Sequence, residues 1–296
     1  MNTSLMPGRV SESPVALVIG AYGSVGDSTA RVLCGEGYTV IGTCLSIAQA
    51  RMLLARGVCH YAVCMALDKP KSINNAFAEI KKAGVKRLDV LVSCAGALHA
   101  DPAWGDDDKI EHHFFEADLE GALRVVHQAL PALLSAHGRI VFIGSSSDGV
   151  GIPVKGAHLS SRIVSDDEVD ALRRELKGER ITVSQVFPRE ITTSLTPQRP
   201  AAGKVRVNKH NGSAAVMAKP YRHRPPLIKL VDRSAQTPLQ VSAVVLKALK
   251  ATQPKPRYFT SLDQVLLRSA VNLIPDSIMS RWMSAMEDTI TATSPR

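Results

Sequence analysis

A serine, a histidine and an arginine stand at a regular spacing in the middle of the chain. Ser145 follows an apolar run, His158 comes thirteen positions later, and Arg162 follows four positions after the histidine. Residues four apart share one face of a helix, so we expect the imidazole and the guanidinium to lie together. A hydroxyl, an imidazole and a cation can bind a polar oxygen and move a proton near neutral pH. The spacing therefore predicts acid–base chemistry.

A second set of residues, near the N-terminus, has the composition of a phosphate-binding turn. An apolar run leads into GAYGSVG and then into a helical pattern. Glycine permits a tight turn and lets an anion approach the free N–H groups at the start of the helix. At the first strand-to-helix turn of a chain, this motif predicts a dinucleotide site. The residues expected to bind the cofactor here are Gly20, Tyr22, Gly23, Ser24, Val25 and Gly26.

The elements that would position these residues alternate between short apolar strands and amphipathic helices. This order predicts an α/β fold, a single Rossmann-like doubly wound parallel sheet of about seven strands with helices on both faces. Open sheets of this kind place their chemistry at the carboxyl ends of the strands, where Ser145 stands. The expected strands are Val15–Ile19, Thr39–Thr43, Tyr61–Cys64, Leu88–Ser93, Ile140–Ile143, Ile181–Val186 and Pro256–Thr260.

Six main helices and four regions complete the expected organisation. Pro131 is expected to bend its helix or to end the first part of it. Residues 1–13 read as a loose tail, 14–260 as the Rossmann-like domain, 195–236 as a basic insertion within it, and 261–296 as C-terminal helices and a tail. The expected helices are Val25–Gly35, Ile47–Ala55, Ile73–Lys82, Lys109–Ala136, His158–Leu176, and one capped by Thr237 and Pro238 that ends near Ala251.

The charge of the chain is concentrated in one segment. The net charge is +9, and the stretch from Arg199 to Arg233 contains nine Lys or Arg and one acid, Asp232. This segment is either a solvated flap or a lid that attracts an anionic ligand. A nucleic-acid binder would place its basic residues in a stripe along helices or strands, so no nucleic-acid partner is expected.

The remaining composition excludes several classes of protein. No apolar run approaches the roughly eighteen residues that a membrane span needs. Five cysteines, at positions 34, 44, 59, 64 and 94, have no zinc-site spacing, so we expect reduced thiols, no metal site and a cytoplasmic location.

These motifs, in this order, resemble those of the short-chain dehydrogenase/reductase superfamily, and the resemblance runs from about Val15 to Tyr258. It identifies the chain as a divergent member and implies binding of NAD or NADP, with the preference open. The C-terminal PKPRY is similar to members that act on retinoids and steroids, which implies a bulky apolar small-molecule substrate. Many members are homodimers or homotetramers, so self-association is an expectation. By the resemblance, the cofactor would also contact Asp68, Cys94, Ala95, Gly96 and Thr193.

The chain departs from the family's cofactor motifs at several positions. Ser24 replaces the second glycine of the turn, and Thr43-Cys-Leu-Ser46 has neither an acid for a ribose nor an arginine for a 2′-phosphate. Cys94 replaces an asparagine, and Arg189 replaces the glycine that follows a proline. These replacements leave it open whether a dinucleotide binds.

The family's catalytic set is also altered. Its serine aligns with Ser145, but His158 replaces the tyrosine, Arg162 replaces the lysine, and Asp118 replaces a supporting asparagine. Imidazole can serve as acid or base, and a carboxylate can fix its tautomer, so Ser145, His158 and Asp118 could also form a triad. Alternatively, the site has lost its activity and His158 is only solvated.

Three functions remain open from the sequence. The first is an NAD(P)-dependent oxidoreductase in which His158 replaces the tyrosine. The second is a non-redox enzyme on the same fold, such as an isomerase, cyclase, lyase or dehydratase. The third is a non-catalytic protein that senses a nucleotide or binds a partner. Of these three, we predict an oxidoreductase that acts on a bulky apolar substrate. If the basic segment contributes to binding, the substrate also has an anionic group.

Overall fold

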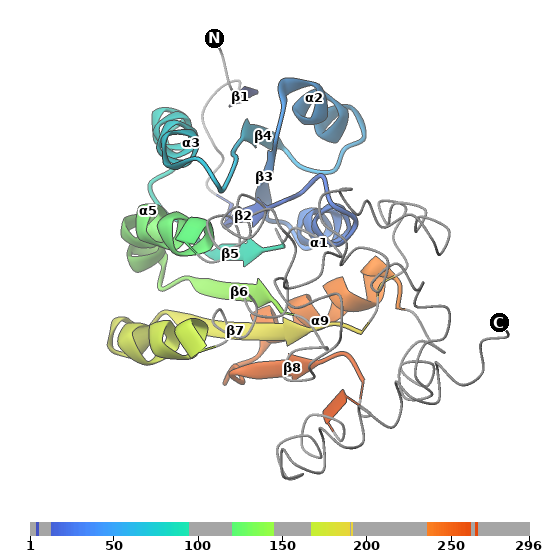
Figure 1. Cartoon of the computed structure of the whole chain (residues 1–296), viewed down its shortest axis with the longest axis vertical. Coiled ribbons are helices and arrows are strands. Elements are labelled where there is room, and N and C mark those ends of the chain that lie inside the picture. Colours follow the sequence, from blue (N-terminus) through green and yellow to red (C-terminus); the bar gives the residue numbers. More distant parts are fainter. Residues whose placement is uncertain are drawn as a thin grey trace, which may run out of the picture.

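An eight-stranded sheet lies at the centre of the chain (Figure 1). The computed structural model describes residues 4–5, 13–94, 120–144, 167–189, 191, 236–261 and 264–265. The strand order is β1-β4-β3-β2-β5-β6-β7-β8, and the seven strands from β2 to β8 are parallel to one another. This confirms the expected parallel sheet. The strands are β2 (Val15–Ile19), β3 (Thr39–Cys44), β4 (Tyr61–Cys64), β5 (Val90–Ser93), β6 (Arg139–Ile143), β7 (Thr182–Phe187) and β8 (Arg257–Phe259).

A short additional strand extends one edge of the sheet. β1 (Ser4–Leu5) pairs antiparallel with β4, with Ser4 opposite Val63 and Leu5 opposite Ala62. The sequence predicts a loose tail over residues 1–13, whereas the structure has a short strand at Ser4–Leu5 within that range. β4 would otherwise present an unpaired row of N–H and C=O groups, and two residues suffice to cover part of it. A pairing this short has no sequence pattern of its own.

Helices cover both faces of the sheet, as the sequence predicts. On one face, α1 (Ser24–Gly35), α2 (Ile47–Ala55) and α9 (Pro238–Lys250) pack against the sheet. On the other face lie α3 (Pro70–Lys82), α5 (Gly121–Ala136) and a helix at residues 167–175, which leads into η2 (Leu176–Glu179). None of the described helices is both long enough and apolar enough to cross a membrane.

The strands are apolar throughout because each is buried on both sides. Along β2, Val15, Leu17 and Ile19 belong to the core under α3 and α5, whereas Ala16 and Val18 belong to the core under α1 and α9. Side chains alternate between the faces of a strand, so a strand covered on both faces reads as a continuous apolar run. This packing explains why the strand boundaries agree with the sequence to within two residues.

One of the two expectations for Pro131 is wrong. The first part of the helix does not end at Pro131, because α5 continues through it to Ala136. The other expectation, a bend at Pro131, stays a prediction. A proline removes one backbone hydrogen bond. Ala129 and Leu133 on either side of the proline are buried in the core, and their packing holds the helix across the gap. The earlier part of the expected helix, residues 109–119, lies outside the described residues.

The start of α9 agrees with its predicted cap. Thr237 Oγ1 accepts a hydrogen bond from Gln240 N at 3.3 Å, and Gln240 Oε1 accepts one from Thr237 N at 2.9 Å. This reciprocal pair is a capping box, and Pro238 occupies the first helical position, where its missing N–H has no consequence.

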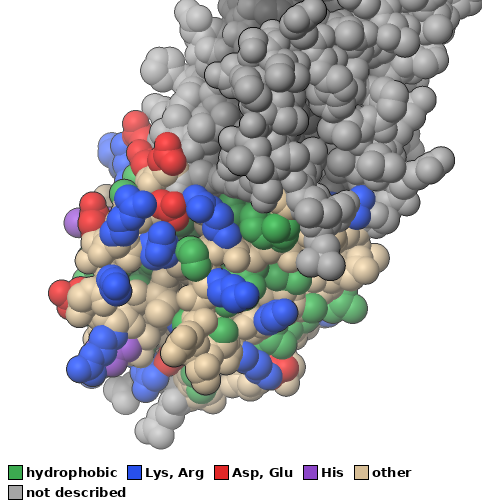
Figure 2. Space-filling view, turned by 90° about the horizontal axis from the view of Figure 1, so that it is seen from below, with side chains coloured by type: hydrophobic (Ala, Val, Ile, Leu, Met, Phe, Trp, Pro, Cys, Tyr) green, Lys and Arg blue, Asp and Glu red, His purple; other side chains and the backbone are tan. Residues whose placement is uncertain are grey.

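The described surface has mixed charge. Figure 2 shows Lys and Arg side chains spread over one face among acidic, apolar and neutral polar side chains, without a continuous stripe. Some charged side chains of the described residues form ion pairs, including Lys250 with Glu36 and Arg257 with Asp170. This face therefore lacks the continuous basic track of a nucleic-acid-binding surface.

Candidate functional site

The carboxyl ends of the parallel strands form one edge of the sheet, and most of the described candidate residues lie along it. β2 runs into the glycine turn at Gly20, β5 ends just before Cys94, and β6 ends just before Gly144. β2 pairs with β5 and β5 with β6, so these three points are successive neighbours. The topology therefore brings together the glycine turn and the approach to Ser145.

The glycine turn forms a compact connection between β2 and α1. Gly20 has a φ of +74°, in the left-handed region that glycine adopts without strain. Its carbonyl accepts a hydrogen bond from Gly23 N at 2.9 Å, and its own N–H binds Thr43 Oγ1 at 3.0 Å. Thr43 O also accepts from Ala21 N at 2.9 Å, which fixes the turn against the end of β3.

The first turn of α1 has free N–H groups at this edge. Gly23 is the N-cap residue, and it has no side chain that could cap the helix. The N–H groups of Ser24, Val25 and Gly26 have no partner within the helix because they belong to its first turn. A helix start of this kind favours an anion.

Gly26 allows this helix to lie against the turn. A Cβ atom at Gly26 would lie 2.1 Å from the carbonyl oxygen of Gly20, and one at Gly23 would lie 3.2 Å from the same oxygen. The first distance is impossible for real atoms, so only glycine fits at position 26. Ser24, which replaces the family's second glycine, is the first residue of α1 and is half-buried.

The residues that directly follow β3 and β4 at this edge have uncharged side chains. Leu45 is 70% exposed, and its N–H donates to Gln49 Oε1 at 2.8 Å. Ser46 caps α2 by accepting from Gln49 N at 3.3 Å. Asp68 is half-buried in the connection from β4 to α3, one strand further along the edge. The edge therefore has one described carboxylate near the place where the sequence expects an adenine.

Cys94 lies next to the glycine turn at the end of β5. Its N–H donates to Ile19 O at 3.1 Å, which continues the pairing of β5 with β2. Burial raises the pKa of the Cys94 thiol to about 12, and a hydrogen bond with Thr29 opposes part of this rise. The thiol is therefore protonated at neutral pH, which makes it a weak hydrogen-bond donor and a poor nucleophile.

The four predicted catalytic residues lie outside the described residues, as do three of the predicted cofactor contacts. The described neighbour of Ser145 is Gly144, whose N–H donates to Val186 O at 2.9 Å. A Cβ at Gly144 would lie 2.8 Å from Phe187 Cε1, so the ring of Phe187 packs directly on this glycine. Phe187 in turn stacks on Phe259 of β8, with ring centroids 5.3 Å apart. The predicted positions outside the description are Asp118, Ser145, His158, Arg162, Ala95, Gly96 and Thr193.

Arg189, which replaces a glycine of the family, fits its position without backbone strain. Among the described residues, only His137 and Arg180 combine a side chain with a positive φ, and Arg189 is not one of them. The arginine therefore does not need the conformational freedom of glycine.

The residues that hold the backbone beyond β7 are not among those predicted from the sequence. Arg189 N donates to Gln236 Oε1 at 3.2 Å and to Thr260 Oγ1 at 3.3 Å. These partners are 47 and 71 positions away along the chain, so no local pattern indicates the contact. Of the two partners, only Thr260 belongs to an element expected from the sequence, the strand Pro256–Thr260.

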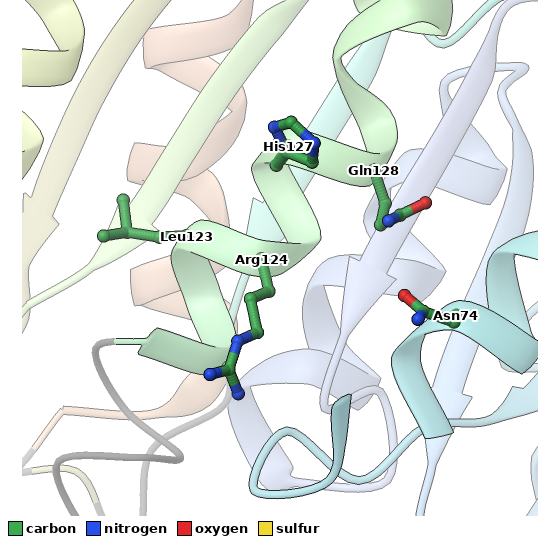
Figure 3. Close-up of a pocket in the computed structure, with 5 residues that line it drawn as sticks. All are labelled: Asn74, Leu123, Arg124, His127 and Gln128. Atoms are coloured by element: carbon green, nitrogen blue, oxygen red, sulfur yellow. The ribbon is translucent and has the colours of Figure 1, made fainter. Parts of the chain in front are cut away.

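A separate hollow lies between α3 and α5 (Figure 3). Its volume is about 260 Å³, and it is lined by Asn74, Leu123, Arg124, His127 and Gln128. These side chains point in different directions, and Arg124 forms an ion pair with Glu120 at 2.7 Å. The hollow therefore has no converging set of groups. No group of His, Cys, Asp and Glu side chains within the described part of the chain could hold a metal ion.

Comparison with known proteins decides the family. A sequence model described as short chain dehydrogenase matches residues 14–203, which is more than half of the chain. The chain belongs to the short-chain dehydrogenase family. This confirms the resemblance inferred from the motifs and the expectation of an oxidoreductase of this family.

Relatives in the family span most of the chain. An uncharacterized oxidoreductase of Escherichia coli K12, YbbO, is 28% identical over 195 residues, which cover 66% of this chain and 71% of that protein. The NADPH-dependent 3-dehydrocapnine reductase of Ornithobacterium rhinotracheale is 25% identical over 277 residues, covering 90% of this chain and 94% of that protein. The 3-ketodihydrosphingosine reductase of Bacteroides thetaiotaomicron is 25% identical over 276 residues, with the same coverage.

Solved structures of the family have the same fold. A short-chain dehydrogenase from Streptomyces avermitilis superposes with a TM-score of 0.72 at 22% identity, covering 96% of this chain and all of that one. A short-chain dehydrogenase from Burkholderia cenocepacia, solved in complex with NADP, has a TM-score of 0.68 at 17% identity and covers 91% of this chain and 97% of that one. These likenesses confirm the Rossmann-like architecture.

Proposed function

We propose that this protein is a dinucleotide-dependent carbonyl reductase or alcohol dehydrogenase of the short-chain family, acting on a bulky and largely apolar substrate. The observation that carries this proposal is the uncapped start of α1 behind a turn in which Gly26 leaves no room for a side chain. A pyrophosphate needs free N–H groups and close backbone approach, and the turn offers both. The NADP complex of the Burkholderia cenocepacia neighbour and the NADPH dependence of the Ornithobacterium relative support the same class of cofactor.

In this proposal, different described residues contact different parts of the dinucleotide. The N–H groups of Ser24, Val25 and Gly26 bind the pyrophosphate, and Asp68 lies at the adenine side. Cys94 lies between the glycine turn and the end of β6, after which Ser145 follows. Its thiol is neutral, so it places no negative charge beside the cofactor. When bound, the nicotinamide supplies or accepts the hydride.

The proton chemistry is assigned to residues outside the described part. Ser145 hydrogen-bonds the substrate oxygen, and His158 exchanges the proton that accompanies hydride transfer, in place of the family's tyrosine. Arg162 is the cation beside the imidazole and favours its neutral form, and Asp118 fixes the tautomer. A neutral imidazole is a base, so this arrangement suits alcohol oxidation at least as well as carbonyl reduction.

The proposed substrate is a ketone with a long apolar chain, or the matching alcohol. Two relatives that span 90% of this chain are named as reductases of 3-dehydrocapnine and 3-ketodihydrosphingosine. The basic segment from Arg199 to Arg233 adds the proposal that the substrate also has an anionic group.

Calorimetric titration with NAD, NADH, NADP and NADPH tests the proposal. We expect at least one of the four to bind, and the comparison decides between the phosphorylated and unphosphorylated forms. If none binds, the protein has no hydride carrier and the oxidoreductase proposal fails.

A paired substitution separates a redox enzyme from other uses of the site. The double variant His158→Tyr with Arg162→Lys restores the residues that the family has at these positions. Gain of reductase activity on a ketone would indicate that the rest of the machinery is intact. Loss of an activity that the unchanged protein has would indicate that His158 is used. Tight cofactor binding without turnover in either protein would instead favour a nucleotide sensor.

A further inference from the structure

The backbone just beyond β7 is held by side chains from two distant parts of the chain. Arg189 N donates to Gln236 Oε1 at 3.2 Å and to Thr260 Oγ1 at 3.3 Å. The carbonyl of Phe187, two residues earlier, accepts from Thr260 N at 3.2 Å. The chain therefore leaves the sheet in a direction set by residues that follow β8 and precede α9.

Gln236 has both halves of its amide engaged in this contact. Its oxygen accepts from Arg189 N, and its Nε2 donates to Thr260 O at 3.3 Å. The residue is 8% exposed, so water does not offer a ready substitute for either partner. The backbone of Gln236 also forms a parallel bridge with Ile191. The glutamine side chain therefore holds the chain at Arg189, and the backbone of the same residue holds it at Ile191.

This role is distinct from the capping of α9. The cap is formed by Thr237 and Gln240, whose side chain and backbone groups pair with one another. Gln236 does not take part in the capping box, and the described side-chain contacts of Gln240 are with Thr237 and not with Arg189. The two glutamines, four positions apart, therefore have separable structural tasks.

The segment held by Gln236 lies at the carboxyl edge of the sheet, close to the end of β6 that leads to Ser145. β6 and β7 are neighbours, and the ring of Phe187 packs on Gly144, the residue before Ser145. Pro188 and Arg189 continue directly from that ring. A shift of the backbone by about 1 Å at such a place can lower a rate by about two orders of magnitude.

We propose that Gln236, together with Thr260, is a positioning residue of the reaction site, which fixes the backbone at Arg189 and Ile191 where the nicotinamide end of the cofactor would bind. The inference rests on the proposed function, since it assigns the residues that orient the same site. Gln236 acts through this backbone and does not itself touch the reacting atoms.

The test compares Gln236→Met with Gln240→Met. Both remove a glutamine amide at nearly constant volume, but only the first removes a hydrogen-bond acceptor of Arg189 N. Binding is measured with NADPH or NADH, whichever the unchanged protein binds more tightly. It is also measured with the matching fragment that lacks nicotinamide, 2′,5′-ADP or ADP. Thr260→Val, which removes the other acceptor of Arg189 N, serves as a second variant if Gln236→Met does not fold.

We expect Gln236→Met to weaken dinucleotide binding at least tenfold while the fragment binds within about twofold of its original affinity. Gln240→Met should lower the unfolding temperature and leave both affinities unchanged. If Gln236→Met changes only the unfolding temperature, or weakens both ligands equally, the residue has a general structural role and the inference fails. If the unchanged protein binds neither ligand, the proposed function fails first, which is a different result.

Discussion

At the scale of single residues, Gly26 shows most directly how the sequence shapes the candidate site. Its lack of a side chain lets α1 begin directly against the carbonyl of Gly20. Gly35, at the other end of the same helix, has nothing within 4 Å of an added Cβ. Gly26 is therefore required by close backbone packing, whereas Gly35 only lowers the helix propensity of α1.

Replacing each of these glycines with alanine should give opposite results. Gly26→Ala forces a methyl group into backbone atoms, so we expect a loss of about 3 kcal/mol in the free energy of unfolding and loss of dinucleotide binding. Gly35→Ala should raise stability by about 0.5–1 kcal/mol because alanine restricts the unfolded chain. Urea unfolding and calorimetry check both. Equal effects of the two changes would contradict the packing argument.

Three cysteine thiols make the stability of the protein depend on pH in the alkaline range. Burial raises the pKa values of Cys44, Cys59 and Cys94 from 9.0 to about 12. The unfolded chain loses these protons near pH 9, whereas the folded chain keeps them. The resulting stabilisation is present below pH about 9 and is lost as the pH rises from there towards about 12.

Ultraviolet absorbance of thiolate measures this difference. At a pH of about 10 we expect little thiolate from the three cysteines in the folded protein, and its appearance when denaturant is added. A Cys59→Ala variant should show correspondingly less thiolate after unfolding and the same low signal before it. Full thiolate absorbance in the folded protein at this pH would refute the assigned shifts.

At the scale of elements, α9 depends on a residue of the neighbouring sheet for its C-terminal end. Arg139, the first residue of β6, donates from Nη1 to Ala251 O at 2.7 Å and to Ala248 O at 3.4 Å. A cation near the last carbonyl groups of a helix satisfies them and complements the helix dipole. The capping box holds the other end, so α9 is fixed at both ends.

Removing this contact should destabilise the protein measurably. Arg139→Met keeps much of the side-chain volume but leaves half-buried carbonyl groups without their donor, so we expect a loss of about 1–2 kcal/mol. Arg124→Met, which removes the more exposed ion pair with Glu120, should cost about 0.5 kcal/mol or less. Urea unfolding midpoints of the two variants provide the comparison, and equal shifts would contradict the capping role.

At the scale of the whole molecule, the folded sheet and the basic segment contribute different properties. The sheet brings the ends of β2, β5, β6 and β7 to one edge, and the candidate site follows from that arrangement. The net charge comes almost entirely from the stretch between Arg199 and Arg233. We therefore expect that stretch to determine the salt dependence of binding.

Neutralising basic residues of the segment should weaken substrate binding in a salt-dependent way. We expect a higher KM for the substrate at an ionic strength of about 0.05 M, and a smaller difference at about 0.5 M, where charges are screened. The changed residues are Lys204, Arg206, Arg222 and Arg224, each replaced by glutamine. Unchanged KM values would return the segment to the role of a solvated flap.

A matched control removes the same charge elsewhere. Four exposed lysines lie near the amino ends of the strands, away from the candidate site. Replacing them with glutamine should leave the KM unchanged at both salt concentrations. The control residues are Lys81, Lys82, Lys86 and Lys177.

The fold class, the order of elements and the glycine turn could all be predicted from the sequence. Each of these depends on patterns within a few residues: apolar runs, helical periodicity, and a turn that only glycine can form. The positions of the predicted catalytic set, Ser145, His158, Arg162 and Asp118, remain sequence-based predictions. Pro131 shows the limit of local rules, because packing of its neighbours in the core outweighed its effect on the helix.

The residues that hold the edge of the sheet in place are seen only in the folded structure. Gln236 contacts Arg189, Arg139 caps α9, Phe187 packs on Gly144, and β1 pairs with β4. These contacts join segments that are far apart in the chain, and each uses a common residue type without a local pattern. They depend on how strands and helices pack in three dimensions, which a single sequence does not specify at the level of individual side chains.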